Sequence, residues 1–219
     1  MARNPMRNKH LLIVVLGVVS IIAGVGLGRY FLPPVETAKP EINGIYISPS
    51  REVEDFELTD QSGQPFTEAE LKDHWSLLFF GYTFCPDVCP TTLAQLNQFY
   101  SRLAVQGVDE DVTVWMISVD PARDTVERLK EYTAFFNPKF GGATGDREEI
   151  DKLAQQFGVY YKIHDPEPGA DYYLVDHSAA VIVINPDARL QAVLTETSST
   201  DNLVKDFLAI RSHYDASQS

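Results

Sequence analysis

The stretch GYTFCPDVCPTT, Gly81–Thr92, decides the fold, because it joins a predicted strand to a predicted helix and holds both cysteines of the 219-residue chain. Residues 75–84, WSLLFFGYTF, form a compact apolar run that is typical of a buried strand. The following segment, 91–107, repeats apolar residues at helical spacing. In open α/β sheets, functional sites form beyond the carboxyl ends of strands, which is where this stretch lies.

The two thiols are separated by three residues, whereas a thioredoxin-type motif has two residues between its cysteines. Cys89 directly precedes the predicted helix, so its sulfur is expected to lie near unpaired N–H groups and the positive end of the helix dipole. That environment lowers a thiol pKa and favours the thiolate, which attacks disulfides and binds metals. A structural disulfide is disfavoured, because so short a loop removes little chain entropy. A redox pair and a metal site that needs a third ligand both stay open.

Strands alternate with helices along the rest of the chain, which predicts an α/β fold with a mixed sheet flanked by helices. A short hairpin is expected at 53–66, with a capping box at Thr67 and Glu70. Further predictions, in chain order, are a strand at 111–121, a helix at 122–136, a loop and helix within 140–159, two strands within 176–196 and a helix at 199–214.

The N-terminus is not expected to belong to the globular domain. Residues 11–28 carry no charge, and an apolar run of this length predicts a transmembrane anchor over 11–32. A cleaved signal peptide is the alternative, which usually has a shorter apolar region followed by a small-residue cleavage site. Three basic residues precede the run, so the positive-inside rule puts the tail, 1–10, in the cytosol. The proline-containing segment 33–50 is interpreted as a tether to a domain over 51–215. Together these features predict a single-pass protein of the bacterial plasma (inner) membrane, with its C-terminal domain on the periplasmic, extracytoplasmic side.

The formal net charge is −13, and the part predicted to be exported carries −17. Such a balance disfavours binding to nucleic acid or to an anionic membrane surface. The ordinary consequence of this charge is solubility.

Five histidines are available as a third metal ligand. His177 lies just before a predicted buried strand, where a histidine is more often a structural residue than a ligand. In a thioredoxin-like fold, however, the segment that precedes this strand packs against the two cysteines. A Cys2His set would then form, and such a set suits copper, with zinc as a competitor.

Three separated motifs carry a resemblance to a known family: GYTFCPDVCPTTL, SVDPARDT (118–125) and YLVDHSAAVIVINPDARL (173–190). With the N-terminal apolar run, they resemble the Sco/SenC family of membrane-anchored, thioredoxin-like copper proteins. The resemblance implies a metallochaperone that binds Cu(I) or Cu(II) through Cys85, Cys89 and His177. It also implies assistance in assembling the copper A centre in subunit II of cytochrome c oxidase. A copper donor and a thiol reductant would be further partners.

An alternative function uses the same thiols. Cys85 and Cys89 could act as a thiol-disulfide oxidoreductase on the cysteines of the oxidase copper subunit, a role that does not require His177.

Around the predicted site, Asp87 is either a tuning group or a solvent-facing carboxylate at the helix start, and Asp176 either orients His177 or is a turn residue. Asp120 and Arg123, in SVDPARDT, are expected to fix their loop rather than to bind metal. A peroxiredoxin is disfavoured, because neither cysteine fits that family's Pro-x-x-x-Thr-x-x-Cys spacing.

Overall fold

The structure, a computed structural model, describes residues 14–21, 23–24, 38–165 and 172–218. The chain divides into two compact units, Met1–Ala38 and Lys39–Ser219. Residues 14–21 and 23–24 are helical, inside the predicted anchor, while the predicted cytosolic tail and the rest of the anchor lie outside the described residues. None of the helices in the described ranges combines the length and the apolar character needed to cross a membrane.

The second unit is built on an eight-stranded sheet in the order β1-β10-β9-β4-β5-β6-β2-β3. Strands β4, β5 and β6 are parallel, whereas β9 runs antiparallel to β4, so the sheet is mixed as predicted. The strands of this sheet are β1 (Gly44–Glu52), β2 (Leu58–Asp60), β3 (Pro65–Phe66), β4 (Trp75–Gly81), β5 (Val112–Ser118), β6 (Gly141–Thr144), β9 (Val181–Ile184) and β10 (Arg189–Leu194).

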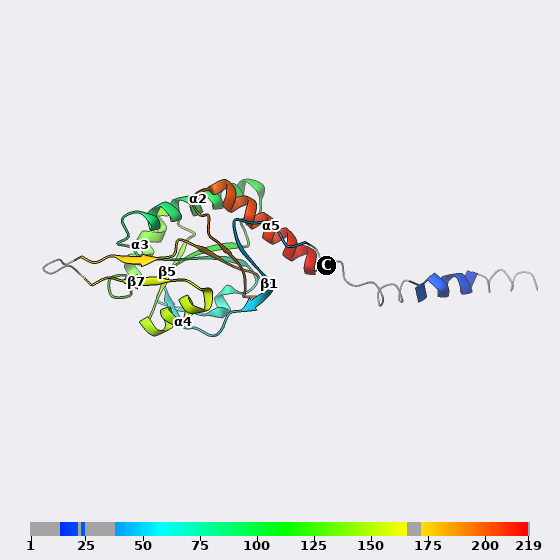
Figure 1. Cartoon of the computed structure of the whole chain (residues 1–219), viewed down its shortest axis with the longest axis horizontal. Coiled ribbons are helices and arrows are strands. Elements are labelled where there is room, and N and C mark those ends of the chain that lie inside the picture. Colours follow the sequence, from blue (N-terminus) through cyan, green and yellow to red (C-terminus); the bar gives the residue numbers. More distant parts are fainter. Residues whose placement is uncertain (1–13, 22, 25–37, 166–171, 219) are drawn as a thin grey trace, which may run out of the picture. The chain divides into compact units, whose positions relative to one another are not determined.

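Helices cover both faces of the sheet (Figure 1). Helix α2 (Val88–Gln106) lies with α5 (Thr200–Gln218) on one side, and α4 (Arg147–Phe157) lies on the other. Helix α3 (Val126–Phe136) packs on β6 and beside α2. All seven residues of β4 are buried, which explains why its sequence is apolar throughout rather than alternating.

Several local predictions are confirmed. The hairpin forms between β2 and β3, and Thr67 with Glu70 makes the reciprocal capping box at the start of a 3₁₀ helix, η1 (Glu68–Leu71). Strands β9 and β10 are joined across the predicted Asn-Pro-Asp-Ala turn. The turn and capping residues of the sequence therefore predict these local structures correctly.

The predicted tether is wrong from residue 44 onward, because Gly44–Glu52 forms β1. This strand pairs antiparallel with β10 at the edge of the sheet. Pro49 suggested a linker, but it lies where the register shifts between Tyr46 and Arg51, and an edge strand tolerates proline at such an irregularity. The domain accordingly begins before residue 51.

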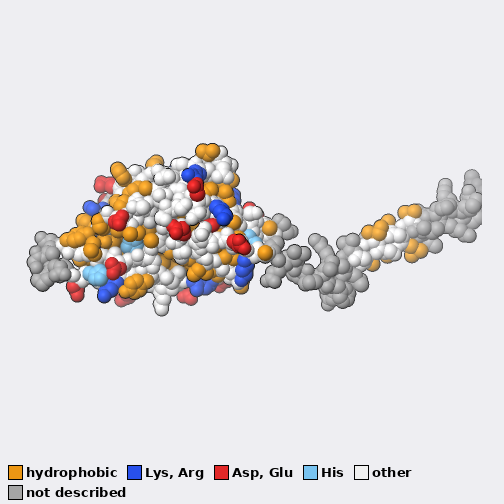
Figure 2. Space-filling view, turned by 45° about the horizontal axis from the view of Figure 1, so that its top comes forward, with side chains coloured by type: hydrophobic (Ala, Val, Ile, Leu, Met, Phe, Trp, Pro, Cys, Tyr) orange, Lys and Arg blue, Asp and Glu red, His pale blue; other side chains and the backbone are white. Residues whose placement is uncertain are grey.

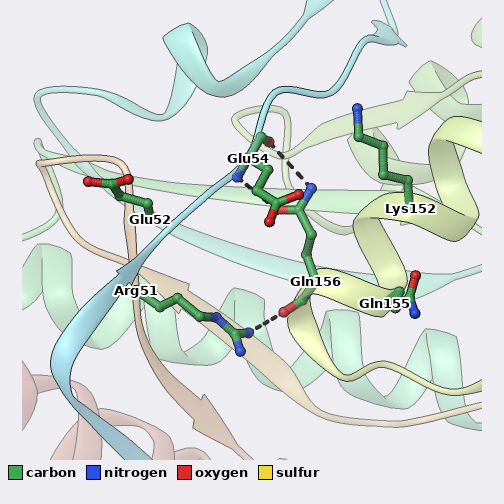
Figure 3. Close-up of a pocket in the computed structure, with 6 residues that line it drawn as sticks. All are labelled: Arg51, Glu52, Glu54, Lys152, Gln155 and Gln156. Carbon is green, nitrogen blue, oxygen red and sulfur yellow. Dashed lines mark hydrogen bonds between the residues drawn. The ribbon is translucent and has the colours of Figure 1, made fainter.

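The end of β1 is fixed to α4 through one glutamine (Figure 3). The side-chain amide of Gln156 accepts a hydrogen bond from Glu54 N–H at 2.9 Å and donates to the Glu54 carbonyl at 3.4 Å. Arg51 donates to the Gln156 backbone carbonyl. These contacts join the edge of the sheet to the helix on that face.

Besides β1, three strands were not predicted from the sequence. Strand β6 lies in the segment expected to be a loop before α4. Strands β7 (Tyr161–Ile163) and β8 (Val175–His177) form a separate antiparallel pair, here called the ribbon, which does not join the eight-stranded sheet. The ribbon is important for the site because His177 is its last residue.

Candidate metal centre

The cysteines lie on the connection between the central strand and the helix that follows it. Strand β4 ends at Gly81, a turn brings Cys85 N–H to the carbonyl of Tyr82 at 3.2 Å, and α2 begins at Val88. Cys89 is therefore in the first turn of α2 and fully buried, whereas Cys85 precedes the helix and is half-buried. Both are free thiols in this structure.

The ribbon brings His177 to the cysteines. The Sγ atoms of Cys85 and Cys89 and a ring nitrogen of His177 all lie within 4.8 Å of one another. Cys89 Sγ is 3.1 Å from His177 Nε2. The three residues that the sequence singled out as ligands thus converge, although the cysteines lie in the loop after β4 and the first turn of α2, and the histidine lies in the ribbon.

The orientation of the His177 ring is fixed by its other nitrogen. Nδ1 lies 3.1 Å from the backbone carbonyl of Ser178, which can only accept a hydrogen bond. Nδ1 therefore carries hydrogen, which leaves Nε2, the ring nitrogen that faces Cys89, as the one available to a metal. The rings of Phe79 and Tyr82 pack edge-on against the imidazole, at centroid distances of 5.8 and 5.9 Å.

Asp176 does not have the orienting contact considered for it. Its side chain is exposed and pairs with His164 Nε2 at 2.7 Å. Successive side chains of a strand point to opposite faces, so Asp176 points away from the face that His177 presents to the thiols. The Ser178 carbonyl makes the contact with His177 instead.

The two thiols differ in acidity, and the difference is the reverse of the sequence prediction. A hydrogen bond from the Cys89 thiol, aided by His177 and by backbone N–H groups, lowers the pKa of Cys85 to about 3. Burial raises the pKa of Cys89. The helix start does supply N–H groups, but Cys89 N–H points at Cys85 Sγ, 3.4 Å away. Cys85 is thus the thiolate, and the proton stays on Cys89.

Asp87 is the N-cap residue of α2, and its side chain makes no capping hydrogen bond. It is exposed, as the solvent-facing alternative required. Its backbone contributes to the site, since a hydrogen bond from Asp87 helps to lower the Cys85 pKa.

Asp124 is a buried carboxylate that the sequence did not single out, although it lies in SVDPARDT. It accepts hydrogen bonds from Thr83 N–H at 3.0 Å, from Thr83 Oγ1 at 2.6 Å and from Ser118 Oγ at 2.7 Å. Burial outweighs these bonds and raises its pKa. The Asp124 side chain therefore fixes the backbone two residues before Cys85.

Gly81 leaves room for the Cys89 sulfur. A Cβ at Gly81 would lie 2.8 Å from Cys89 Sγ and 2.8 Å from Phe79 Cε1. We therefore expect Gly81→Ala to lower the free energy of unfolding by about 1–3 kcal/mol, as overpacking does in a tight core. Urea denaturation of the reduced protein measures this loss.

The Cys89→Ala background provides the control for Gly81. Because this background removes the sulfur, Gly81→Ala should cost clearly less there. An equal penalty in both backgrounds would show that Phe79, and not the thiol, requires the glycine.

Sequence comparison identifies the family of the chain. The model of the SCO1/SenC family matches residues 46–211. An SCO2-like protein of Rickettsia felis is 34% identical over 187 residues, covering 84% of this chain and 90% of the relative. The human mitochondrial SCO1 homolog is 39% identical over 132 residues, covering 60% of this chain and 44% of that protein.

Solved structures of similar proteins indicate the same family. The apo Sco1 protein of Thermus thermophilus is 37% identical, with a TM-score of 0.68, covering 79% of this chain and 99% of that one. Arabidopsis thaliana ScoI, solved with copper bound, is 36% identical with a TM-score of 0.66, covering 73% and 98%. The predicted thioredoxin-like fold is confirmed by this likeness. The extent of the match shows that the chain belongs to the SCO1/SenC family.

Proposed function

We propose that this protein is a copper metallochaperone that carries copper on Cys85 Sγ, Cys89 Sγ and His177 Nε2. The convergence of these three atoms within 4.8 Å is the observation that supports the proposal. Soft thiolates select Cu(I), and imidazole also suits Cu(II). Related chains from Arabidopsis thaliana and yeast have been solved with copper bound.

The spacing of the three atoms suits one metal ion. Metal–ligand bonds of about 2.0–2.3 Å place ligand atoms roughly 3.3–4.6 Å apart, so small side-chain rotations close the set. Binding would displace the Cys89 proton, because a coordinating thiol is deprotonated. Three protein ligands leave a position at which ligands from an acceptor can enter before those of the carrier leave.

The proposed acceptor is subunit II of cytochrome c oxidase, at its copper A centre, as membership of the family suggests. A copper donor and a thiol reductant complete the cycle. Hydrophobic side chains gather at the end of the domain that carries the ribbon (Figure 2). Exposed Val88, Tyr172 and Leu174 belong to the segments around the site, and exposed apolar groups of this kind favour contact with a protein partner.

We further propose that the uncharged run 11–28 anchors the protein in the bacterial plasma membrane, with the domain on the outer side. Support comes from the length of the run and from the basic residues that precede it. An anchor would hold the site near a membrane-bound acceptor and raise their effective concentration.

Copper titration tests the carrier function. The full chain in detergent, reduced and anaerobic, is titrated with Cu(I) against a competing chelator. We expect one copper per chain and an affinity that falls more than about a hundredfold in His177→Ala, because loss of a direct ligand should cost more than loss of an outer contact. The control is His213→Ala, which removes a histidine that packs on Tyr46, away from the cysteines. Equal affinity in wild type and His177→Ala would refute the proposed ligand set.

The acidity of Cys85 favours a second candidate, a thiol-disulfide reductase. The Cys85 thiolate would attack a partner disulfide, forming a mixed disulfide and releasing one partner thiolate. Cys89 would then lose its proton and attack Cys85 Sγ, which releases the second partner thiolate. The chain would be left with a Cys85–Cys89 disulfide, two electrons having passed to the partner. His177→Ala should keep most of this activity while losing copper, and that difference separates the two functions.

A further inference from the structure

The ribbon carries His177, yet its strands do not pair with the main sheet. A two-stranded ribbon is marginally stable on its own, so its position depends on side-chain contacts with the rest of the domain. One contact comes from Tyr82, whose hydroxyl oxygen accepts a hydrogen bond from Val175 N–H at 3.3 Å. The placement of His177 therefore depends on groups outside the ribbon.

Arg123, in the loop between β5 and α3, makes a second and more extensive contact. Its Nη1 donates to the backbone carbonyl of Tyr173 at 3.0 Å, just before β8 begins. Its guanidinium lies over the Tyr173 ring, 3.5 Å from the centroid. The side chain is only 14% exposed, so these contacts are made largely out of water.

Asp120 fixes the arginine in place. Its fully buried carboxylate accepts a hydrogen bond from Arg123 Nε and another from the Tyr173 hydroxyl at 2.7 Å. One carboxylate thus holds both the arginine and the tyrosine on which the arginine stacks. A planar guanidinium with several donors suits such a stacked and forked arrangement better than an ammonium does.

The same guanidinium also reaches the cysteine loop. It lies 4.9 Å from the Phe84 ring centroid and 5.6 Å from that of Tyr82. Phe84 directly precedes Cys85, and Tyr82 packs against His177. Arg123 therefore packs against both halves of the candidate site. It is not itself a ligand, because a protonated guanidinium has no acceptor atom to offer a metal.

We propose that Arg123 is a positioning residue, which holds the ribbon against the cysteine loop so that His177 reaches Cys89. The expected effect on copper affinity rests on the proposed function, whereas the effect on the position of the ribbon does not. Since loss of an outer contact typically costs 10–100-fold in metal affinity, Arg123→Ala should weaken Cu(I) binding by about that factor.

A double-mutant cycle tests the route through His177. Cu(I) affinity of the reduced full chain is measured for wild type, Arg123→Ala, His177→Ala and the double variant. Arg123→Ala should weaken binding in the wild-type background and have little effect when His177 is absent. An equal loss in both backgrounds, or no loss in either, would overturn the proposal. Arg123→Lys, which keeps a charge beside Asp120, serves if Arg123→Ala does not fold, and should fall between wild type and Arg123→Ala.

Arg128 provides a matched control. Its guanidinium lies 3.9 Å from the Phe84 centroid and it donates to Thr83, both in the cysteine loop, whereas no hydrogen bond or ring contact joins it to the ribbon strands β7 and β8. Arg128→Ala should leave Cu(I) affinity within about threefold of wild type, below the range for outer contacts. A loss as large as that of Arg123→Ala would assign the effect to the loop and refute ribbon positioning.

Hydrogen exchange of the metal-free chain gives a readout that is independent of copper. Arg123→Ala should speed amide exchange over Val175–His177 and leave that of α2 unchanged. Unchanged exchange in the ribbon would overturn the proposal even if affinity falls. If wild type binds no copper but exchange in the ribbon rises as expected, the proposed function fails and the positioning role stands.

Discussion

Reduced, metal-free protein should be alkylated by iodoacetamide at Cys85 nearly as fast at pH 5 as at pH 8. The thiolate is the reacting form, and a pKa of about 3 keeps Cys85 ionised over this whole range. For a thiol with the ordinary pKa of about 8.5, the thiolate fraction would be roughly 800-fold smaller at pH 5 than at pH 8. Mass spectrometry of the quenched reaction gives both the rate and the modified residue.

Cys89 provides two controls for the alkylation experiment. Its thiol is buried and its pKa is raised, so it should remain unmodified in the native protein at either pH. Cys89→Ala removes the hydrogen bond that is the largest cause of the low Cys85 pKa, so the rate at pH 5 should then drop steeply. A Cys85 rate that already falls in proportion to hydroxide concentration in the wild type would contradict the assignment of the thiolate.

Asp124→Ala should destabilise the domain by on the order of 3 kcal/mol, because buried donors left without an acceptor cost about 1–3 kcal/mol each. The affected donors are Thr83 N–H, Thr83 Oγ1 and Ser118 Oγ. Urea denaturation of reduced, metal-free protein measures the change. Because the lost contacts fix the start of the cysteine loop, the substitution should also expose Cys89 to alkylation.

Asp124→Asn is the matched control for this substitution. The amide keeps an acceptor oxygen for Thr83 and carries no charge, so it avoids the burial cost that raises the pKa of the aspartate. We expect it to lose less than half as much stability as the alanine variant. Equal losses in the two variants would show that charge, rather than an acceptor at this position, is what the fold requires.

The sequence predicts the layers of the fold well wherever periodicity is strong, as in β4, β5 and the long helices. It fails at β6, whose GGAT sequence suggests a loop. The glycines are there for packing: a Cβ at Gly141 would lie 2.3 Å from the Trp115 ring, so the neighbouring strand can carry that large side chain only against a glycine. No pattern within the segment itself carries this information.

The site could be predicted in part. Cys85 and Cys89 follow from their spacing and position, whereas His177 required the predicted fold and a family resemblance, since a histidine before a strand is ordinary. The acidity of the thiols was assigned to the wrong cysteine, because the sequence does not show which sulfur is buried. The roles of Asp124 and Arg123 depend on contacts that the β5–α3 loop makes with Thr83 and Tyr173. Contacts between segments so far apart in the sequence cannot be predicted from local periodicity.

The pairing of β1 with β10 has a consequence for how the protein is made. Gly44, at the start of the domain, pairs with Leu194, close to its end, so the first strand has no partner until almost the whole chain has been synthesised. His177 and β9, the antiparallel neighbour of β4, also come long after the cysteines. During synthesis both thiols therefore emerge well before His177 and β9. Where synthesis delivers the chain to an oxidising compartment, a disulfide between the two thiols is the hazard of this order.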